Sequence, residues 1–266
     1  MNPLLSVITV VFNGEKDLET TLQTLWCQTF LDYELLVIDG DSTDGTLQII
    51  EKNKSHINYF VSEKDEGLYH AMNKGIAAAR GKFLYFLNVG DELFDRQTLQ
   101  NVFADEQNLK AHLIYGKTIT KQNPLGADYV FGKQISIKNF YFTSAPICHQ
   151  SSFIQKKCFD QLGGFDLRYR IFADQDWFIR CFLQPHFKIV FLDRVISRFQ
   201  VEGVSFHSRI SGFRESMDSG SRHFPPHIVW IKKILFLFIL TKKYTINLLI
   251  NTTIYKVYTR LKKNLR

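Results

Sequence analysis

This 266-residue sequence has few cysteines and lacks long apolar runs. Its four cysteines show no CxxC spacing, which argues against a disulfide framework and against a zinc ribbon. The apolar run between Lys233 and Lys242 has eight residues, whereas a membrane-spanning helix needs about 20. A strand-like pattern begins almost at the first residue, so we expect no targeting peptide. These absences predict buried, reduced thiols in a cytoplasmic protein.

Acidic residues are absent from the last 45 positions. Residues 222–266 contain ten Lys or Arg and no Asp or Glu, so residues 1–221 carry a net charge of −3 although the whole chain carries +7. Such asymmetry is typical of a basic tail with an anionic partner, either a membrane surface or nucleic acid. We therefore predict two parts, a globular domain over 1–221 and a basic, amphipathic helical extension over 222–266.

The dinucleotide-binding motif is missing as well. The first strand-like run, Ser6–Phe12, is followed by NGEKD and not by GxGxxG, which argues against a dehydrogenase but leaves mononucleotides and nucleotide-sugars open. Apolar, β-branched runs alternate with segments of helical period, which predicts an α/β fold with a parallel sheet. The predicted strands span 6–12, 33–39, 57–61 and 82–88, and the predicted helices span 17–28, 46–51 and 68–80.

The pattern is less regular after about residue 105. We expect strands over 112–119, 147–154 and 188–192, a turn at 163–166 and a helix over 174–183. In a parallel sheet, ligands bind beyond the carboxyl ends of the strands. Asn13, Asp39, Asp41 and Asp91 follow predicted strands, so we expect these polar side chains at one edge.

Several motifs occur in an order that resembles the family 2 glycosyltransferases, most closely the bacterial enzymes that build surface polysaccharides. They are SVITVVFNG, VIDGDSTDGT, SEKDEGLYHAMNKGIAAARGKFLYFLNVGDEL, PICHQSSFI, GGFD and ADQDWFIR, and they span about residues 4–206. The resemblance implies the GT-A fold, a Rossmann-like nucleotide-binding fold with a mostly parallel central sheet. It also implies a nucleotide-sugar donor and an acceptor that is a glycan or a lipid-linked glycan.

The resemblance further implies a set of nucleotide contacts at the sheet edge. They are Thr9, Val11, Asn13, Asp39, Gly67 and Asn88. The Asp39 carboxylate can accept an imino hydrogen of the base; the alternative is an Asx turn that starts the following loop. Many relatives carry acidic residues where this chain has Asn88 and Gly90, so the ribose contact departs from the family pattern.

Asp91, in LNVGDEL, matches the last acid of the family's metal-binding cluster. A carboxylate at this place can hold Mg²⁺ or Mn²⁺, which offsets the charge of a departing diphosphate. The alternative is a solvated helix cap.

Two acids in ADQDWFIR raise the question of a general base. The resemblance assigns that role to Asp174, and Asp176 is the second candidate. Asp174 also suits an N-cap. His149 and Gln150 match the family's HQ pair and are expected near the donor sugar or acceptor, with a structural role as the alternative. A lone helical histidine such as His70 is more typically structural.

The basic extension mixes lysine pairs with aromatic and aliphatic residues. Its composition favours a segment that lies on an anionic, cytoplasmic membrane surface; the alternatives are packing on the domain or on another subunit. A glycine-bearing loop at 200–205 resembles one that closes over the site. We therefore predict an inverting, metal-dependent glycosyltransferase. Its rivals are a non-catalytic nucleotide-binding scaffold and a nucleic-acid-binding module, of which the apolar tail disfavours the second.

Overall fold

The computed structural model describes residues 2–121, 129–142, 147–200 and 209–251. Contacts between Cα atoms divide the chain into two compact units, Met1–Ser216 and Met217–Arg266. All four cysteines lie in the described ranges as free thiols. The prediction that they are buried holds for Cys158 and Cys181 but is wrong for Cys27, which is exposed, and for Cys148, which is partly exposed.

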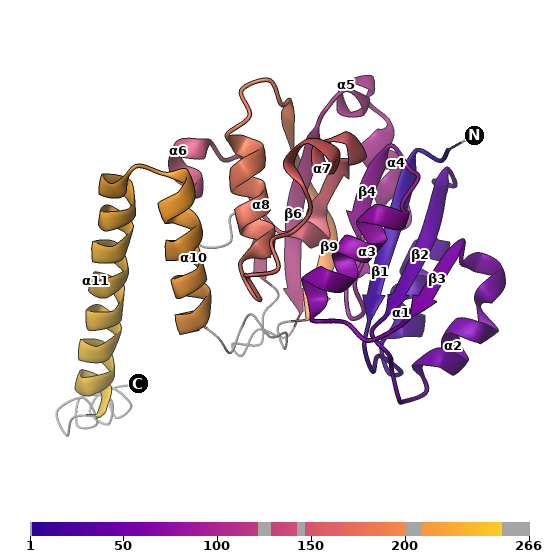
Figure 1. Ribbon diagram of the computed structural model, residues 1–266, viewed down its shortest axis with the longest axis horizontal. Coiled ribbons are helices and arrows are strands. Elements are labelled where there is room, and N and C mark those ends of the chain that lie inside the picture. Colours follow the sequence, from indigo (N-terminus) through magenta and orange to yellow (C-terminus); the bar gives the residue numbers. More distant parts are fainter. Residues whose placement is uncertain (1, 122–128, 143–146, 201–208, 252–266) are drawn as a thin grey trace, which may run out of the picture. The chain divides into compact units, whose positions relative to one another are not determined.

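Four parallel strands form the first half of the sheet, in the order β3-β2-β1-β4 (Figure 1). They are β1 (Leu5–Val11), β2 (Tyr33–Asp39), β3 (Tyr59–Ser62) and β4 (Phe83–Phe86). Every residue of β1 and of β4 is buried. Continuous apolar runs of this kind are typical of parallel strands that are covered on both faces.

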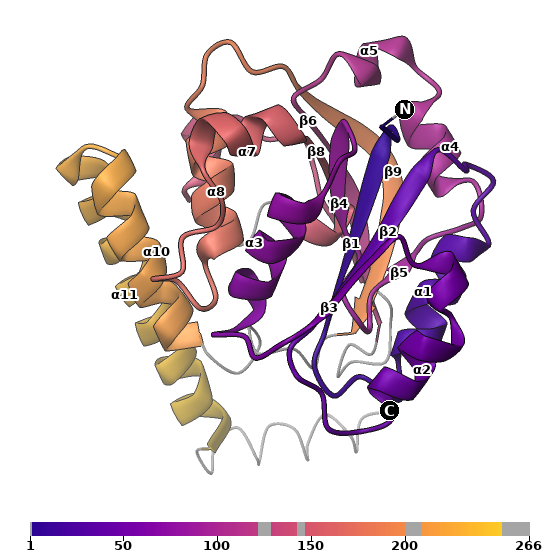
Figure 2. The ribbon, with the colours of Figure 1, turned by 45° about the vertical axis from the view of Figure 1, so that its right-hand side comes forward.

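Helices cover both faces of these strands (Figure 2). On one face, α1 (Leu18–Trp26), α2 (Thr46–Lys52) and α4 (Thr98–Phe103) share one apolar core with alternate residues of β1, β2 and β4. On the other face lie α3 (Leu68–Ala78), α7 (Lys156–Leu162) and α8 (Ala173–Phe182). There, Gly75 of α3 touches Ile8, and the ring of Phe86 packs edge-on against Phe159 of α7.

The second half of the sheet mixes strand directions. β8 (Ser152–Gln155) runs antiparallel to β4, and β6 (Leu113–Lys121) runs antiparallel to β8. β9 (Ile189–Gln200) is parallel to β6, and β5 (Glu92–Leu93) and β7 (Tyr129–Phe131) are short antiparallel additions to β9 and β6. The α/β fold is thus confirmed, with a parallel half and a mixed half. Three short helices lie between these elements in the chain: η1 (Lys54–His56), α5 (Glu106–Leu109) and α6 (Ile137–Phe140). Of these, α6 packs on α8 through the rings of Phe140 and Phe182.

The strand predicted over 147–154 is wrong in its first half. His149–Ser151 form a 3₁₀ turn, η2, and β8 begins only at Ser152. The carbonyl of Cys148 accepts hydrogen bonds from the Ser151 N–H (3.1 Å) and from the Ser152 hydroxyl (2.7 Å). These local bonds compete with strand pairing, as serine side chains often do, and they leave His149 buried at the sheet edge.

The carboxyl ends of β1, β2 and β4 lie at one edge. Val11 pairs with Asp39, Asp39 pairs with Ser62, and Ile8 pairs with Phe86. The residues that follow these strands are therefore neighbours, as expected from the alternating pattern. At the start of α2, Gly45 is the N-cap, and the Asp44 carboxylate accepts the N–H of Thr46 (3.0 Å).

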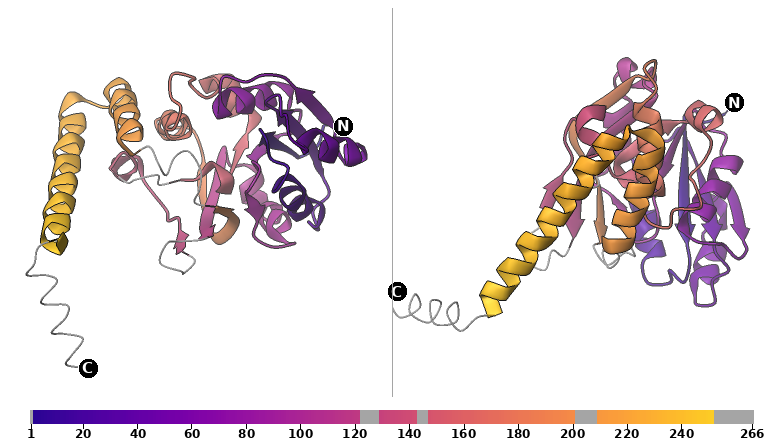
Figure 3. Two further views of the ribbon diagram at one scale, coloured as in Figure 1. Left: turned by 90° about the horizontal axis from the view of Figure 1, so that it is seen from below. Right: turned by 60° about the vertical axis from the view of Figure 1, so that its left-hand side comes forward.

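Two helices follow the sheet. α10 spans Arg209–His223, and α11 spans Pro226–Asn251 as one unbroken helix (Figure 3). Within the described ranges, we find no helix with the length and apolar character needed to cross a membrane. Residues 201–205 of the predicted closing loop and the last 15 residues of the basic extension lie outside the described residues.

Candidate active site

An Asn88–His149–Asp174 chain of contacts joins the end of β4 to η2 and to α8. His149 Nδ1 lies 3.1 Å from Asp174 Oδ2, and His149 Nε2 lies 3.3 Å from Asn88 Nδ2. Because an amide nitrogen can only donate, Nε2 accepts from Asn88. Nδ1 then carries the imidazole hydrogen and donates it to Asp174. The chain thereby fixes both the ring orientation and the tautomer of His149.

The Asp174 carboxylate receives hydrogen bonds on both oxygens. Oδ1 accepts from the Gln175 N–H (2.7 Å) and lies 3.2 Å from the Tyr69 hydroxyl, and Oδ2 also lies 3.3 Å from Gln175 Nε2. Burial and the charge of Asp174 raise the pKa of Tyr69 well above its usual value, so this hydroxyl stays protonated. The Asp174 side chain is 11% exposed. It is a fixed carboxylate with a small accessible edge.

The N-cap alternative for Asp174 is wrong. The N-cap of α8 is Phe172, and Asp174 is the second residue inside the helix. A carboxylate in a first turn interacts favourably with the positive end of the helix dipole. Helix geometry therefore supports the position of this carboxylate without using it as a cap.

Asp91 is a buried acid near the same histidine. It is 6% exposed, and no helix begins after it, since Glu92–Leu93 form β5; the helix-cap alternative is therefore wrong. Burial raises the pKa of Asp91 to about 7, although hydrogen bonds from the Asn88 backbone and from Gln150, and the charge of His149 whenever its imidazole is protonated, oppose the rise. Such a carboxylate is held in the apolar interior without a full set of donors.

Oxygen donors at this point fit a divalent metal ion. Asn88 Oδ1 is buried and has no hydrogen-bond partner, and the Asp91 carboxylate follows three residues later. Carboxylate and amide oxygens are the ligands that Mg²⁺ and Mn²⁺ prefer. Over the described part of the chain, no group of three or more His, Cys, Asp or Glu residues could hold a metal. A metal here would thus draw most of its ligands from phosphate and water.

At the ends of β1 and β2, polar side chains form hydrogen bonds with the loops and the neighbouring strand at this edge of the sheet. Asp39 is fully buried, and its carboxylate accepts from the Ser42 N–H (3.0 Å), the Ser42 hydroxyl (2.5 Å) and the Ser62 hydroxyl (2.6 Å). Asn13 Oδ1 accepts the N–H of Thr43 (2.9 Å), at a positive backbone φ of 50°. These bonds match the turn alternative for Asp39, and its contact with a base stays a prediction.

The remaining predicted contacts differ in accessibility. Thr9 and Val11 are buried within β1. Gly67 begins α3 with a φ of 130°, a backbone conformation that other residues rarely adopt. Gly90 has a φ of 90°, and its N–H donates to Thr21 (3.0 Å). The nucleotide roles of Thr9, Val11, Gly67 and Asn88 also stay predictions.

Asp176 forms an ion pair with Arg180, and His70 contacts Asp65. Asp176 accepts from Arg180 Nε (3.0 Å), and the same guanidinium donates to the carbonyls of Leu162 and Gly164. Asp176 therefore helps to join α8 to the turn after α7. His70 Nδ1 lies 2.9 Å from Asp65, which suits a structural histidine.

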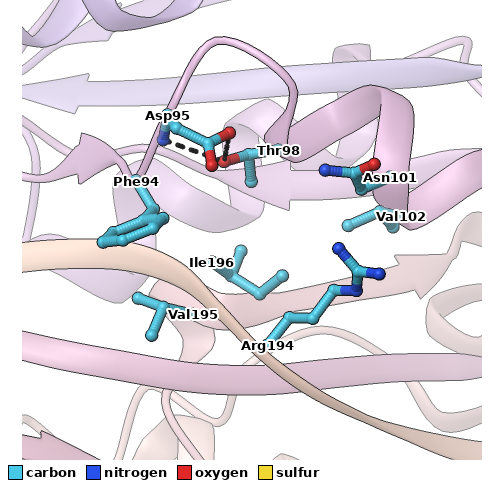
Figure 4. Close-up of a pocket in the computed structure, with 8 residues that line it drawn as sticks. All are labelled: Phe94, Asp95, Thr98, Asn101, Val102, Arg194, Val195 and Ile196. Atoms are coloured by element: carbon cyan, nitrogen blue, oxygen red, sulfur yellow. Dashed lines mark hydrogen bonds between the residues drawn. The ribbon is translucent and has the colours of Figure 1, made fainter.

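A small pocket of about 170 Å³ lies elsewhere, between α4 and β9 (Figure 4). Its lining is Phe94, Asp95, Thr98, Asn101, Val102, Arg194, Val195 and Ile196. None of the carboxylates discussed above reaches it. We therefore place the candidate active site at the carboxyl edge of the sheet and not in this pocket.

Comparison with known proteins assigns the chain to a family. Residues 6–161 match the family model described as glycosyl transferase family 2. The chain belongs to this family. A PGL/p-HBAD biosynthesis glycosyltransferase of Mycobacterium tuberculosis is 32% identical over 205 residues, which are 76% of this chain and 78% of the relative. A GalNAc(5)-diNAcBac-PP-undecaprenol beta-1,3-glucosyltransferase of Campylobacter jejuni is 30% identical over 131 residues, which are 48% and 42% of the two chains.

Solved structures of glycosyltransferases share the fold. S. aureus TarS in complex with UDP-GlcNAc has a TM-score of 0.66 at 24% identity, covering 82% of this glycosyltransferase and 64% of TarS. A mannosyltransferase from Pyrobaculum calidifontis in complex with GDP-Man and Mn²⁺ has a TM-score of 0.62 at 17% identity, covering 88% and 69%. This glycosyltransferase thus spans less than two thirds of the TarS chain. The family and fold predicted from the motifs are confirmed.

Two side chains that contact the site were not singled out from the sequence. Tyr69 touches Asp174, and Glu215 accepts hydrogen bonds from the segment that enters α8. Tyr69 lies 105 residues before its partner, and no motif marks Glu215. Only the folded chain reveals these contacts.

Proposed function

We propose that this family 2 glycosyltransferase moves one sugar from a nucleotide-sugar donor to a hydroxyl of a growing, lipid-linked surface glycan, with inversion at the anomeric carbon. The carboxylate of Asp174, which lies 3.1 Å from the His149 ring, carries the proposal, and the buried carboxylate of Asp91, whose pKa is influenced by the same histidine, supports it. The names of the M. tuberculosis and C. jejuni relatives support the acceptor class. The UDP-GlcNAc and GDP-Man complexes of the neighbours support the donor class.

Asp174 is the proposed general base. Its carboxylate takes the proton of the acceptor hydroxyl while that oxygen bonds to the anomeric carbon. The bond from this carbon to the phosphate oxygen breaks, and the nucleoside diphosphate leaves with the bonding electrons. Attack from the face opposite the leaving group inverts the configuration. A positioned base of this kind contributes roughly 10²- to 10⁴-fold in rate.

Asp91 and Asn88 are the proposed protein ligands of Mg²⁺ or Mn²⁺. When bound, the cation would neutralise charge on the leaving diphosphate. His149 restrains Asp174 through its Nδ1 hydrogen. The neutral tautomer set by Asn88 keeps this donor aimed at Asp174.

A donor panel tests the function directly. UDP- and GDP-sugars are incubated with Mn²⁺ and lipid-linked acceptors, and product is measured for wild type, Asp174→Asn and the matched control Asp160→Asn, whose carboxylate is exposed on α7. We expect transfer by wild type and control, loss of at least 100-fold in Asp174→Asn with unchanged circular dichroism, and an inverted anomeric signal by NMR. Near-normal turnover of Asp174→Asn would contradict the assignment of Asp174 as the general base. Nucleotide binding without any transfer would favour the scaffold.

We further propose that the basic extension holds the enzyme at the inner face of the cell membrane. Six large apolar side chains of α11 are exposed and recur at positions i, i+1, i+4, i+5, i+7 and i+8 of the helix, which places them on one side: Trp230, Ile231, Ile234, Leu235, Leu237 and Phe238. The surrounding residues 222–266 contain ten basic and no acidic residues, which suits anionic lipid.

Sedimentation with vesicles tests this attachment. Vesicles with 30% anionic lipid, vesicles of neutral lipid, and nucleic acid are compared for wild type, for Trp230→Ser/Phe238→Ser and for Leu31→Ser, a matched control at an apolar side chain that is 77% exposed. We expect the anionic vesicles to bind wild type and control but not the double variant. Retention on nucleic acid with no vesicle binding would contradict the proposal.

A further inference from the structure

Three consecutive backbone N–H groups point at one carboxylate just before α8. Arg170 N donates to Glu215 Oε1 (3.1 Å), and Ile171 N and Phe172 N both donate to Glu215 Oε2 (2.9 Å each). Phe172 is the N-cap of α8 and offers no side-chain acceptor of its own. A carboxylate from α10, more than 40 residues later in the chain, therefore accepts from three consecutive amides at the entrance to α8, among them that of the N-cap residue itself.

The same segment is held from its opposite side by Tyr69. The carbonyl of Ile171 lies 3.0 Å from the Tyr69 hydroxyl, and this hydroxyl also lies 3.2 Å from Asp174 Oδ1. Ile171 is thus fixed through its N–H by Glu215 and through its C=O by Tyr69. Asp174 follows only three residues later and shares the Tyr69 hydroxyl with Ile171.

Packing supports the contact. A Cβ added at Gly212, one turn before Glu215 on α10, would meet the Ile171 side chain at 3.5 Å. The first part of α10 therefore lies directly against the segment whose amides Glu215 binds. Glu215, Gly212 and Asp174 all belong to the unit Met1–Ser216.

We infer that Glu215 is a positioning residue for the base: its carboxylate fixes the segment 170–172, and through this segment and Tyr69 it sets the direction of the Asp174 carboxylate. The inference rests on the proposed role of Asp174. Catalysis by a base depends on placing its oxygen within hydrogen-bond reach of the acceptor hydroxyl, and a shift of about 1 Å can cost about 100-fold in rate. Glu215 acts on that placement without touching the substrate.

Kinetics of Glu215→Gln test the inference. Glutamine keeps the length of the side chain, but it puts an NH₂ group against at least one of the three N–H groups. We expect kcat to fall roughly 10- to 100-fold, while KM for the donor and the affinity for nucleoside diphosphate stay within about twofold. Glu215→Asp, which retains the charge, should recover part of kcat. Asp218→Asn, at an exposed ion pair further along α10, is the matched control and should behave as wild type.

A double-variant cycle separates positioning from simple loss of structure. If Glu215 acts through Asp174, Glu215→Gln should lower kcat strongly in the wild-type background and hardly at all in Asp174→Asn. A loss of folded protein would instead lower kcat by the same factor in both backgrounds, and that result would overturn the inference. Unchanged kcat in Glu215→Gln would overturn it as well. A wild-type chain without transfer activity would refute the proposed function, and the inference with it.

Discussion

Replacing Asp91 with asparagine should stabilise the metal-free protein at alkaline pH. Burial raises the pKa of Asp91 from 3.8 to about 7 in the folded state. Between these two values, the folded chain holds a proton that the unfolded chain has lost. The contribution of Asp91 to the free energy of unfolding is therefore fully present below about pH 4 and is lost as the pH rises through about 7. Asparagine stays neutral throughout and removes this loss.

The magnitude follows from the size of the shift. Three pKa units correspond to about 4 kcal/mol between the two protonation states. Most of the pH range between the unfolded and the folded pKa of Asp91 lies above pH 5. The difference in unfolding free energy between Asp91→Asn and wild type should therefore grow by about 3 kcal/mol between pH 5 and pH 8. For a domain of about 200 residues this is roughly 6–12 °C in Tm.

Urea unfolding in EDTA at pH 5, 6, 7 and 8 measures this difference. Asp160→Asn, which removes an exposed carboxylate on α7, is the control and should give a flat difference. Adding Mn²⁺ at 100 times its Kd should stabilise wild type at pH 8 by about 3 kcal/mol and leave Asp91→Asn unchanged, because the ion favours the charged carboxylate. A difference between Asp91→Asn and wild type that does not change with pH would refute the burial argument. Equal stabilisation of both proteins by Mn²⁺ would refute the metal assignment.

Two further substitutions test single contacts. In His149→Asn, the side-chain amide can replace the Nδ1 donor to Asp174, so kcat should fall less than about tenfold. In His149→Gln, the amide lies near the place of Nε2 and the bond to Asp174 is lost, so kcat should fall roughly 100-fold. Equal kcat values would show that the bond to Asp174 does not matter. Gly75→Ala would put a Cβ 2.3 Å from the Ile8 side chain. Despite about 1 kcal/mol of gained helix propensity, we expect a lower Tm by calorimetry, and an unchanged or higher Tm would contradict this close packing of α3 on β1.

Strands whose period and end signals agree were predictable from the sequence. β2 was predicted over the residues it occupies, Tyr33–Asp39, because an apolar run is followed at once by a glycine-rich loop. β5, β7, α4, α5, α6 and α7 were missed, since short elements offer too few residues for a period to show. The 15-residue helix α10 was missed as well. β9 was predicted over 188–192 and extends from Ile189 to Gln200, because it pairs with the long β6 and charged residues interrupt its apolar pattern.

The site was only partly predictable. Motifs pointed to Asn88, Asp91, His149 and Asp174, and the structure brings these side chains together. The bond between Asp39 and Ser42 is local and matches the Asx turn given as an alternative, whereas the bond from Ser62 could not be predicted, because β2 and β3 meet only in the folded sheet. Tyr69 and Glu215 went unnoticed for the same reason.

The antiparallel pairing of β4 and β8 brings two distant parts of the chain to the same place at the sheet edge. Because β8 runs opposite to β4, the residues that precede β8 arrive at the edge where the residues that follow β4 leave it. Asn88 and His149, 61 positions apart, become neighbours without a long excursion of either chain segment. Two adjacent hydrogen-bonded strands therefore keep Asn88 and His149 together, whatever the length of the chain segment that connects them.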